Sequence, residues 1–288
     1  MKITKKYLTK NDCYKSGRRI NPIGIQIHTI GTAQNTAQSL ADYWNQPGVS
    51  ACVHYAVDAE TEGKVLQFLP ENFRSWADAG YGNNNLITIE QMESDYMRYT
   101  GGASYTVTNS AKFKADVMRA YRGCVELCAD ICKQYGWNPK KKLTSGLYLI
   151  SSHDEGRRAG LSSAHVDPTH VWGRFGLTMD GFRDDVEKAL KPVLKLKKGV
   201  KVKLTTDIYI RTGVSTKYDQ AGYTKYTDLS TSARKKSKRL SGNKAKLKKG
   251  TRVQILEVKT AWNGDLWIKI KSGWLPVCVK GGYRVKAA

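Results

Sequence analysis

The stretch Ser151-Ser-His-Asp-Glu-Gly-Arg-Arg-Ala-Gly-Leu-Ser-Ser-Ala-His-Val-Asp-Pro-Thr-His-Val-Trp172 carries three of the chain's five histidines, His153, His165 and His170. Pro168 disfavours a helix immediately before it, and the glycines and serines oppose a long helix through the rest. Neutral imidazole and carboxylate groups are both good zinc ligands. The stretch is therefore predicted to be a metal-binding loop, and the alternative is a run of solvated polar side chains.

Two predicted strands end beside histidines. Residues 23–30 alternate apolar with small or polar side chains, which predicts a strand with His28 near its end, facing away from the isoleucines. The apolar run 147–150 predicts another strand, with His153 just beyond it. Because α/β folds gather their sites at strand ends, both histidines are candidate metal ligands. The alternative for His28 is an ordinary exposed histidine.

Strands and helices alternate through residues 1–192, which predicts a layered α/β domain with a mixed β-sheet and flanking helices. Cys124, Cys128 and Cys132 recur every four residues in the longest predicted helix, so they share one face and are predicted to lie in the core. The other predicted strands are 51–58, 64–69 and 86–90, and the predicted helices are 35–44, 110–135 and 180–190.

Three further positions are candidates for a site. Glu90 ends an apolar strand, where burial would raise its pKa toward the range useful for a general base, and Glu93 is its rival. His54 lies within a predicted strand, as a structural residue or part of a substrate wall. Residues 76–85 are rich in Gly and Asn and carry aromatic side chains, which is typical of loops that line sites.

The net charge of +23 is unevenly distributed. Residues 193–288 hold 24 Lys and Arg against 5 Asp and Glu, a net of +19, which leaves +4 for residues 1–192. A strongly basic module implies an anionic partner, such as nucleic acid, anionic lipid or cell-wall polymer. The chain is therefore expected to divide into a part that carries chemistry and a basic part that binds.

Several ordered motifs in the first part resemble the zinc-dependent N-acetylmuramoyl-L-alanine amidases of the type found in phage endolysins and related to peptidoglycan recognition proteins. They extend over about 170 residues in the family's order, and the ordered set is more specific than any one of them. The matching pieces are Ile25-Gln-Ile-His28-Thr, Ser50-Ala-Cys-Val-His54-Tyr-Ala-Val-Asp58 with Gln67, Trp76-Ala-Asp-Ala-Gly80, Asn85-Leu-Ile-Thr-Ile-Glu90, Ser152-His153-Asp-Glu and His165-Val-Asp167-Pro168.

The resemblance implies that His28, His153 and Asp167 bind Zn²⁺ and leave a fourth position for water. It implies that Glu90 helps to activate that water. The family commonly has Lys two residues before the last ligand, to stabilise the tetrahedral oxyanion, whereas this chain has His165. Some relatives use Cys as the last ligand, where Asp167 stands here. His170 is a rival ligand, because it could pair with His165.

The resemblance also concerns the substrate groove. It implies that Trp76 and the segment Asn83–Asn85, including Asn85, line a groove for glycan and peptide. A purely structural role is the alternative for Trp76. His54 falls on a His-Tyr pair that is not usually a ligand in the family, and it is expected to border the substrate.

Residues 199–288 contain short alternating strands separated by glycines, which predicts a small all-β barrel. Ile208-Tyr-Ile-Arg-Thr-Gly213 and Gly273-Trp-Leu275 resemble the bacterial SH3-like (SH3b) cell-wall-binding module. Residues 218–246 are predicted to be a basic insertion that forms a mobile, solvated loop. Trp262, Trp267 and Trp274 are candidates to stack on sugars or to fill the barrel core.

Together these observations predict a peptidoglycan hydrolase with a catalytic domain at residues 1–192 and a wall-binding domain at residues 199–288. The expected partners are peptidoglycan and an anionic wall polymer, and nucleic acid is not expected. Residues 1–22 have no apolar signal segment, and no run of about 18 apolar residues occurs. We therefore expect synthesis in the host cytoplasm, no membrane span, release through a holin-type pore and action at the cell wall. A non-catalytic peptidoglycan receptor and a hydrolase that cuts another peptidoglycan bond are the alternatives.

Overall fold

The computed structural model covers residues 1–288 and describes all of them except 191–193, 195, 216–221, 262–263 and 280–281. The chain divides into two compact units, Met1–Pro192 and Val193–Ala288, which we call the first unit and the second unit. No helix in the described residues combines the length and the apolar character needed to cross a bilayer. Trp262 lies outside the described residues.

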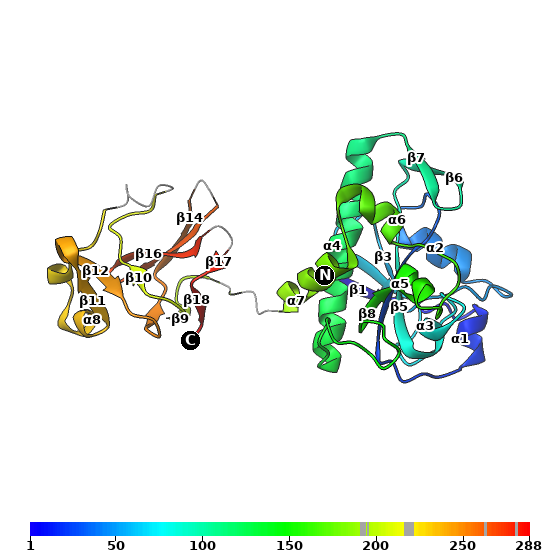
Figure 1. Cartoon of the computed structure of the whole chain (residues 1–288), viewed down its shortest axis with the longest axis horizontal. Helices are drawn as coiled ribbons and strands as arrows, with labels where there is room; N and C mark the ends of the chain where they lie inside the picture. Colours follow the sequence, from blue (N-terminus) through cyan, green and yellow to red (C-terminus); the bar gives the residue numbers. More distant parts are fainter. Residues whose placement is uncertain (191–193, 195, 216–221, 262–263, 280–281) are drawn as a thin grey trace. The chain divides into compact units, whose positions relative to one another are not determined.

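The first unit is built on a six-stranded mixed sheet, in agreement with the predicted α/β class (Figure 1). All neighbouring strands run parallel except β3 and β4, which form the predicted hairpin pair. The strand order is β1 (Lys2–Lys5), β4 (Lys64–Gln67), β3 (Tyr55–Val57), β5 (Leu86–Gln91), β2 (Gly24–Thr29), β8 (Ile150–Ser152).

Helices cover both faces of this sheet, so its central strands are buried on both sides (Figure 1). One face packs against α4 (Ser110–Tyr135) and α7 (Met179–Leu190). The other face carries α1 (Asp12–Ser16), α2 (Ala37–Trp44), α3 (Tyr81–Asn85) and α5 (His153–Arg158). All six residues of β2 are buried, so the predicted alternation of an inner and an outer face is wrong for this strand. His28 does face away from the isoleucines, but it lies in the interior.

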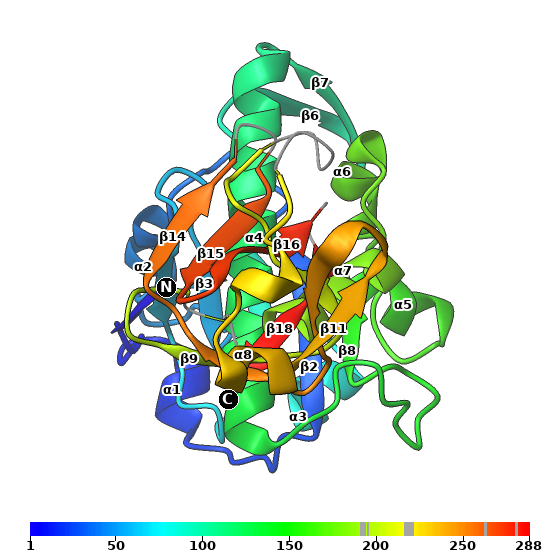
Figure 2. The same cartoon turned by 90° about the vertical axis from the view of Figure 1, so that its left-hand side faces the viewer.

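The α4 helix begins and ends where the sequence predicts. The side chain of Asn109 accepts a hydrogen bond from the Lys112 backbone N–H at its start, and Gly136 ends it in the left-handed conformation. Cys124, Cys128 and Cys132 are buried in its core face, as expected. The β6–β7 hairpin (Met97–Gly101 and Ser104–Val107) precedes α4 and projects near its N-terminal end, close to α6 (Thr169–Trp172), in both views (Figures 1 and 2).

Two further predictions for the first unit are wrong. The strand predicted over 51–58 contains only Tyr55–Val57, so His54 precedes the strand. The predicted Gly/Asn-rich loop at 76–85 ends in the short helix α3. The helix propensity of its residues does not explain α3, because they are mainly Gly and Asn and the N-cap residue Gly80 offers no side-chain cap. Hydrogen bonds from the preceding segment hold it in place.

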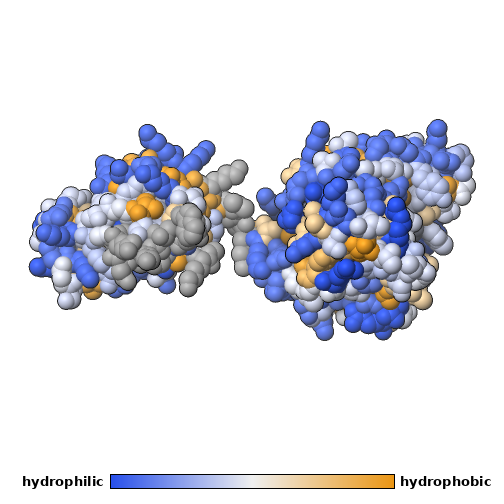
Figure 3. All heavy atoms as spheres, turned by 90° about the horizontal axis from the view of Figure 1, so that it is seen from above, coloured by the Kyte–Doolittle hydropathy of each residue, from blue (hydrophilic) through white to orange (hydrophobic). Residues whose placement is uncertain are grey.

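The second unit consists mainly of short antiparallel strands in three small sheets. Their orders are β10 (Ile208–Tyr209), β12 (Lys244–Leu247), β11 (Ser237–Leu240); β13 (Arg252–Gln254), β9 (Lys201–Leu204), β18 (Val285–Ala287); and β14 (Glu257–Thr260), β15 (Leu266–Ile270), β16 (Gly273–Val279), β17 (Gly282–Tyr283). The core contains Val202, Ile208, Ile268, Leu275 and their neighbours. Hydrophilic residues predominate on the face drawn in Figure 3, and hydrophobic residues form only small, separate areas there.

The prediction of a mobile loop at 218–246 is wrong for the described residues 222–246. They contain α8 (Thr231–Lys235), β11 and most of β12, and Leu229 and Ala245 are buried in the core. Trp267 and Trp274 are also buried, so neither is available to stack on a sugar. Both tryptophans therefore belong to the packing of the unit.

Candidate metal centre

His28, His153 and Asp167 converge at the carboxyl ends of β2 and β8. These strands are parallel neighbours, so His28 near the end of β2 and His153 just after β8 meet at one edge of the sheet. Their Nδ1 atoms are 3.0 Å apart. The Oδ2 atom of Asp167 lies 3.4 Å from Nδ1 of His28, and its Oδ1 atom lies 3.5 Å from Nδ1 of His153.

A series of hydrogen-bonded side chains determines which nitrogen of His28 carries a proton. The Asp78 carboxylate can only accept, so the Ser162 hydroxyl donates to it at 3.1 Å. Ser162 then accepts from Nε2 of Gln26 at 3.3 Å, which directs Oε1 of Gln26 toward Nε2 of His28 at 3.2 Å. This places a proton on Nε2 of His28 and leaves Nδ1 facing His153 and Asp167.

Nε2 of His153 lies 3.0 Å from the hydroxyl oxygen of Ser163, so Nδ1 of His153 faces Nδ1 of His28 beside the Asp167 carboxylate. Two ring nitrogens and a carboxylate directed at one another can bind a cation together. Two imidazoles and one carboxylate suit Zn²⁺ and leave a tetrahedral position for a further ligand. The residues present therefore fit the metal that the sequence motifs imply.

Asp78 organises the segment before α3. Its carboxylate accepts hydrogen bonds from the backbone N–H groups of Gly80, Gly82 and Asn83 at 2.7–3.0 Å. A Cβ atom at Gly82 would overlap the amide oxygen of Gln26, so this position requires glycine. Gln26, Asp78, Ser162 and Ser163 were not predicted as site residues from the sequence, because their roles depend on contacts between distant segments. The position of Asp78 within a Gly/Asn-rich run was the local signal that could have pointed to it.

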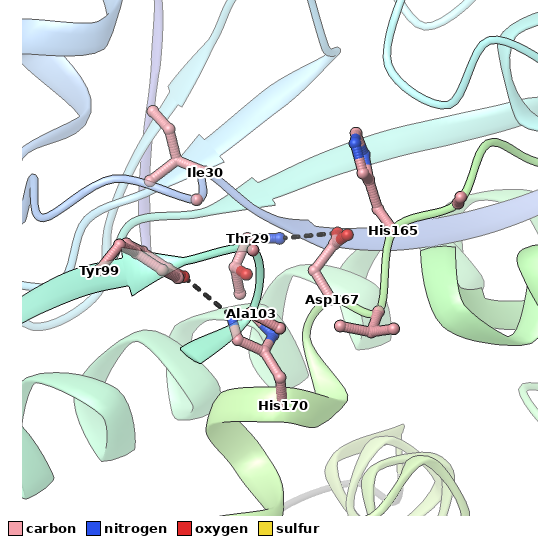
Figure 4. A pocket seen from close by; sticks show the side chains of 11 residues that line it. Thr29, Ile30, Tyr99, Ala103, His165, Asp167 and His170 are labelled. Carbon is pink, nitrogen blue, oxygen red and sulfur yellow. Dashed lines mark hydrogen bonds between the residues drawn. The ribbon is translucent and has the colours of Figure 1, made fainter. Parts of the chain in front are cut away.

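Hydrogen bonds also fix the backbone around Asp167 and His153. The N–H of Thr29 donates to Oδ2 of Asp167 at 3.2 Å, which ties the loop that carries Asp167 to the end of β2 (Figure 4). Ser152 and Glu155 form a capping box at the start of α5, where His153 is the first helical residue. Arg183 on α7 pairs with Glu155 through two hydrogen bonds of 3.1 Å. His153 is therefore held by a rigid helix start.

Glu90 is the neighbour of His28 across the β2–β5 ladder, so their side chains share one face of the sheet. Burial raises the pKa of Glu90 to about 8. A cation on the three ligands would favour its ionised form, because opposite charges nearby lower a carboxyl pKa. Glu93 is less available, because the Tyr99 hydroxyl lies 2.8 and 2.9 Å from its two carboxylate oxygens.

A cavity of about 560 Å³ opens beside Asp167 (Figure 4). His165 is exposed at its wall, with its ring centroid 4.9 Å from that of His153. Nε2 of His170 lies 2.8 Å from the Tyr99 hydroxyl, and both residues line the cavity. His170 is not part of the three-ligand group in the described residues. The rival interpretation of His170 as a ligand therefore gains no support from the described residues.

The structure separates the three predicted substrate residues from this cavity, since none of them lines it. His54 is fully buried: its Nε2 lies 2.8 Å from the Phe73 carbonyl oxygen, and its Nδ1 accepts from the Thr88 N–H at 2.9 Å. Burial lowers the pKa of His54 to about 4. The expectation that His54 contacts substrate is wrong, because a neutral, enclosed imidazole holds the strands together.

Trp76 and Asn85 have different environments. Trp76 is 46% exposed and lies under the Arg74 guanidinium, 4.8 Å from its ring centroid. Both residues border a smaller cavity of about 180 Å³ that also includes Arg18. Asn85 ends α3 and donates to the Tyr81 carbonyl at 2.9 Å. Trp76 is thus accessible to a ligand, whereas Asn85 stabilises its own helix.

A family profile described as N-acetylmuramoyl-L-alanine amidase matches residues 18–170, which is just over half of the chain. The chain belongs to this family. The span matched to the amidase family contains His28, Glu90, His153, His165 and Asp167. The second unit lies outside it.

A curated protein and two solved structures are similar to this member of the amidase family. The lytic amidase of Streptococcus pneumoniae phage HB-3 is 25% identical over 170 residues, which are 58% of this chain and 47% of that protein. The chain thus spans about half the length of that relative. The hydrolase AmiA of Staphylococcus aureus, solved with its ligand, is 19% identical over 66% of this chain and 83% of its own, with a TM-score of 0.49. The protein PlyL is 19% identical over 65% of this chain and 97% of its own, with a TM-score of 0.44.

Proposed function

We propose that the chain is a zinc-dependent N-acetylmuramoyl-L-alanine amidase that acts on bacterial peptidoglycan. The reaction would hydrolyse the amide between the lactyl group of N-acetylmuramic acid and the L-alanine of the stem peptide. One observation carries the proposal: in a chain of this family, His28, His153 and Asp167 present three ligand atoms to one point, all within 4.8 Å of one another.

His28, His153 and Asp167 would hold the ion. Bound zinc supplies Lewis acidity, which lowers the pKa of a water ligand to about 7 and polarises a carbonyl group. The Gln26 amide oxygen and the Ser163 hydroxyl lie beside the two Nε2 atoms and would accept their protons, so that both Nδ1 atoms would be available as ligands.

Glu90 would act as the general base. Its place beside His28 lets its carboxylate accept a proton from the attacking water. The same group can then return the proton to the leaving amine of L-alanine. The water oxygen joins the lactyl carbonyl carbon, and the C–N bond breaks.

His165 would stabilise the carbonyl oxygen as it gains negative charge. It is exposed at the cavity wall beside His153 and has an N–H to donate. The 560 Å³ cavity, which Tyr99 and His170 also line, would receive the substrate. Trp76 would contact a more distant part of the same glycan-peptide chain.

The second unit would bind the cell wall. Its short strands, its glycines and the motif at 208–213 support an SH3b-like module, and its net charge of +19 supports an anionic wall polymer as the ligand. The first unit would then cut peptidoglycan in the same wall to which the second unit holds the protein.

Mass spectrometry of digested cell walls tests the bond that is cut. We expect intact stem peptides with a new L-alanine N-terminus and glycan strands without new reducing ends. New reducing ends would indicate a glycosidase, and a new N-terminus within the peptide would indicate an endopeptidase. Walls that stay intact despite tight binding would indicate a non-catalytic receptor. An Asp167→Ala protein treated in parallel is the control for contaminating hydrolases.

A further inference from the structure

The second unit contains a basic cavity of about 320 Å³ between β10, β12 and the segments around Pro276 and Arg284. Its wall carries three cations from distant parts of the chain: Arg211, Lys246 and Arg284. Tyr209 lies among them. We call this feature the basic cavity.

Two tyrosine rings organise the positive charge at one side of the basic cavity. Tyr209 and Tyr223 pack edge to face with ring centroids 5.2 Å apart. The guanidinium carbon of Arg211 lies 3.8 Å from the centroid of Tyr223, and Nζ of Lys246 lies 4.8 Å from that of Tyr209. Nζ of Lys244 lies 4.3 Å from the Tyr223 centroid. Cation–π contacts therefore hold three cationic side chains close together.

In the described part of the cavity wall, Asp207 is the one carboxylate. Both of its oxygens are engaged: Nζ of Lys238 and the backbone N–H of Lys249 each lie 2.7 Å away. Lys238 is also the direct cross-strand partner of Lys246, and Asp207 compensates the charge of Lys238. No ion pair involves Lys246 or Arg284 in the described residues. A bound anion would compensate the charge of these two side chains.

We propose that the basic cavity binds the phosphodiester groups of an anionic cell-wall polymer. This inference rests on the proposed function, because action at the wall is what brings such a polymer to the protein. Arginine and lysine together suit phosphate, since the guanidinium donates two parallel hydrogen bonds and the ammonium adds a compact charge. The cavity has room for one phosphate with its flanking polyol.

The same geometry opposes a single-stranded nucleic acid as the ligand. Proteins that bind such strands stack bases on open aromatic faces. Here cationic side chains already lie over the rings of Tyr209 and Tyr223. Each ring is therefore already in contact with a cation, which favours a ligand recognised by its charge over one recognised by stacking.

The test measures binding of full-length protein to purified poly(glycerol phosphate), which lacks peptidoglycan and is not a substrate. We expect Lys246→Gln/Arg284→Gln to bind the polymer at least about tenfold more weakly than wild type, with the slope of log affinity against log salt reduced by about two. The control Lys198→Gln/Lys201→Gln removes the same charge from exposed positions outside the cavity. It should stay within about twofold of wild type, because screened surface charges contribute little.

Equal losses in the two double variants would show that binding follows diffuse charge and would overturn the proposal. Tighter binding of a single-stranded oligonucleotide than of the polymer would overturn it as well. If Lys246→Gln/Arg284→Gln fails to fold by circular dichroism, the Arg284→Gln single variant replaces it, with weaker binding than wild type and a slope reduced by about one expected. Because no bond is broken in this assay, a failure of the amidase proposal leaves its result interpretable.

Discussion

At the level of single residues, the β2–β5 register places Glu90 beside His28. Replacing Glu90 by Gln keeps the shape and removes the base. We expect Glu90→Gln to retain stoichiometric zinc and to lose about 10²–10⁴-fold in wall lysis, the usual contribution of a general base. Turbidity clearance of isolated walls and metal analysis of the same sample measure the two effects.

Glu93→Gln is the matched control for this prediction. Glu93 is buried like Glu90 but is hydrogen-bonded to Tyr99, so its loss should affect lysis much less. If Glu90→Gln lyses walls normally and Glu93→Gln does not, the role of base belongs to Glu93.

Gln26 is predicted to tune the metal site through His28. Gln26→Leu removes the acceptor that keeps the His28 proton on Nε2. Loss of such a supporting hydrogen bond typically weakens metal binding by about 10–100-fold. Competition with a chromophoric chelator would measure the zinc affinity. Gln91→Leu is the control, because this glutamine is also buried, on β5, and bonds Trp172 instead of a ligand. Equal zinc affinities in the two variants would show that Gln26 has no such role.

The proposed ligands could be predicted from sequence because each stands in a local motif: a histidine near a strand end, a histidine after a strand, and an Asp-Pro pair. Gln26, Asp78 and Ser162 could not, because their importance arises only where three distant segments meet. The prediction that His54 borders the substrate is wrong for a related reason. Its motif is local, but its buried hydrogen bonds are to Phe73 and Thr88, which lie elsewhere in the sequence.

At the scale of elements, predictions from sequence succeed where local signals and packing agree. The α4 helix has a side-chain cap, a periodic apolar face and a terminal glycine, and its predicted bounds are correct. The segment 222–246 shows the opposite case, because its many lysines conceal the alternation of Lys244, Ala245, Lys246 and Leu247. Ala245 and Leu247 are buried, and the lysine stems lie on the other face.

The integration of β12 into the second unit is testable by mutation. Leu247→Ala should lower that unit's free energy of unfolding by about 2–5 kcal/mol, the usual range for a buried leucine. Lys249→Ala, at an exposed position, should change it by less than about 0.5 kcal/mol. Urea unfolding followed by tryptophan fluorescence measures both, because Trp267 and Trp274 are buried in this unit. If Leu247→Ala leaves the free energy of unfolding unchanged, the segment is the loosely packed insertion that its composition indicates.

Along the full chain, most of the net charge is separated from the proposed catalytic residues. The second unit carries +19 of the net charge of +23, while all five histidines lie in the first unit. This division was visible in the sequence, because composition needs no knowledge of the fold. The basic cavity was not visible, because Arg211, Lys246 and Arg284 are brought together by strand pairing.

The charge separation predicts that salt acts on wall binding more than on the chemical step. Retention of the full-length protein on isolated walls should fall steeply between about 50 mM and 500 mM NaCl, because salt screens exposed charges. Hydrolysis of a small soluble muramoyl-peptide should change much less. Co-sedimentation and product release measure the two quantities. Retention that is independent of salt would contradict the electrostatic account of the second unit.

The amidase proposal requires that His28, His153 and Asp167 share one zinc ion. Anomalous diffraction from crystals of the zinc-loaded protein, collected on either side of the zinc absorption edge, measures whether they do. We predict a single strong peak within about 2.0–2.2 Å of Nδ1 of His28, Nδ1 of His153 and an Asp167 carboxylate oxygen. The peak should be absent from Asp167→Ala crystals treated in the same way. A peak elsewhere in the molecule, or none at these three residues, would contradict the account.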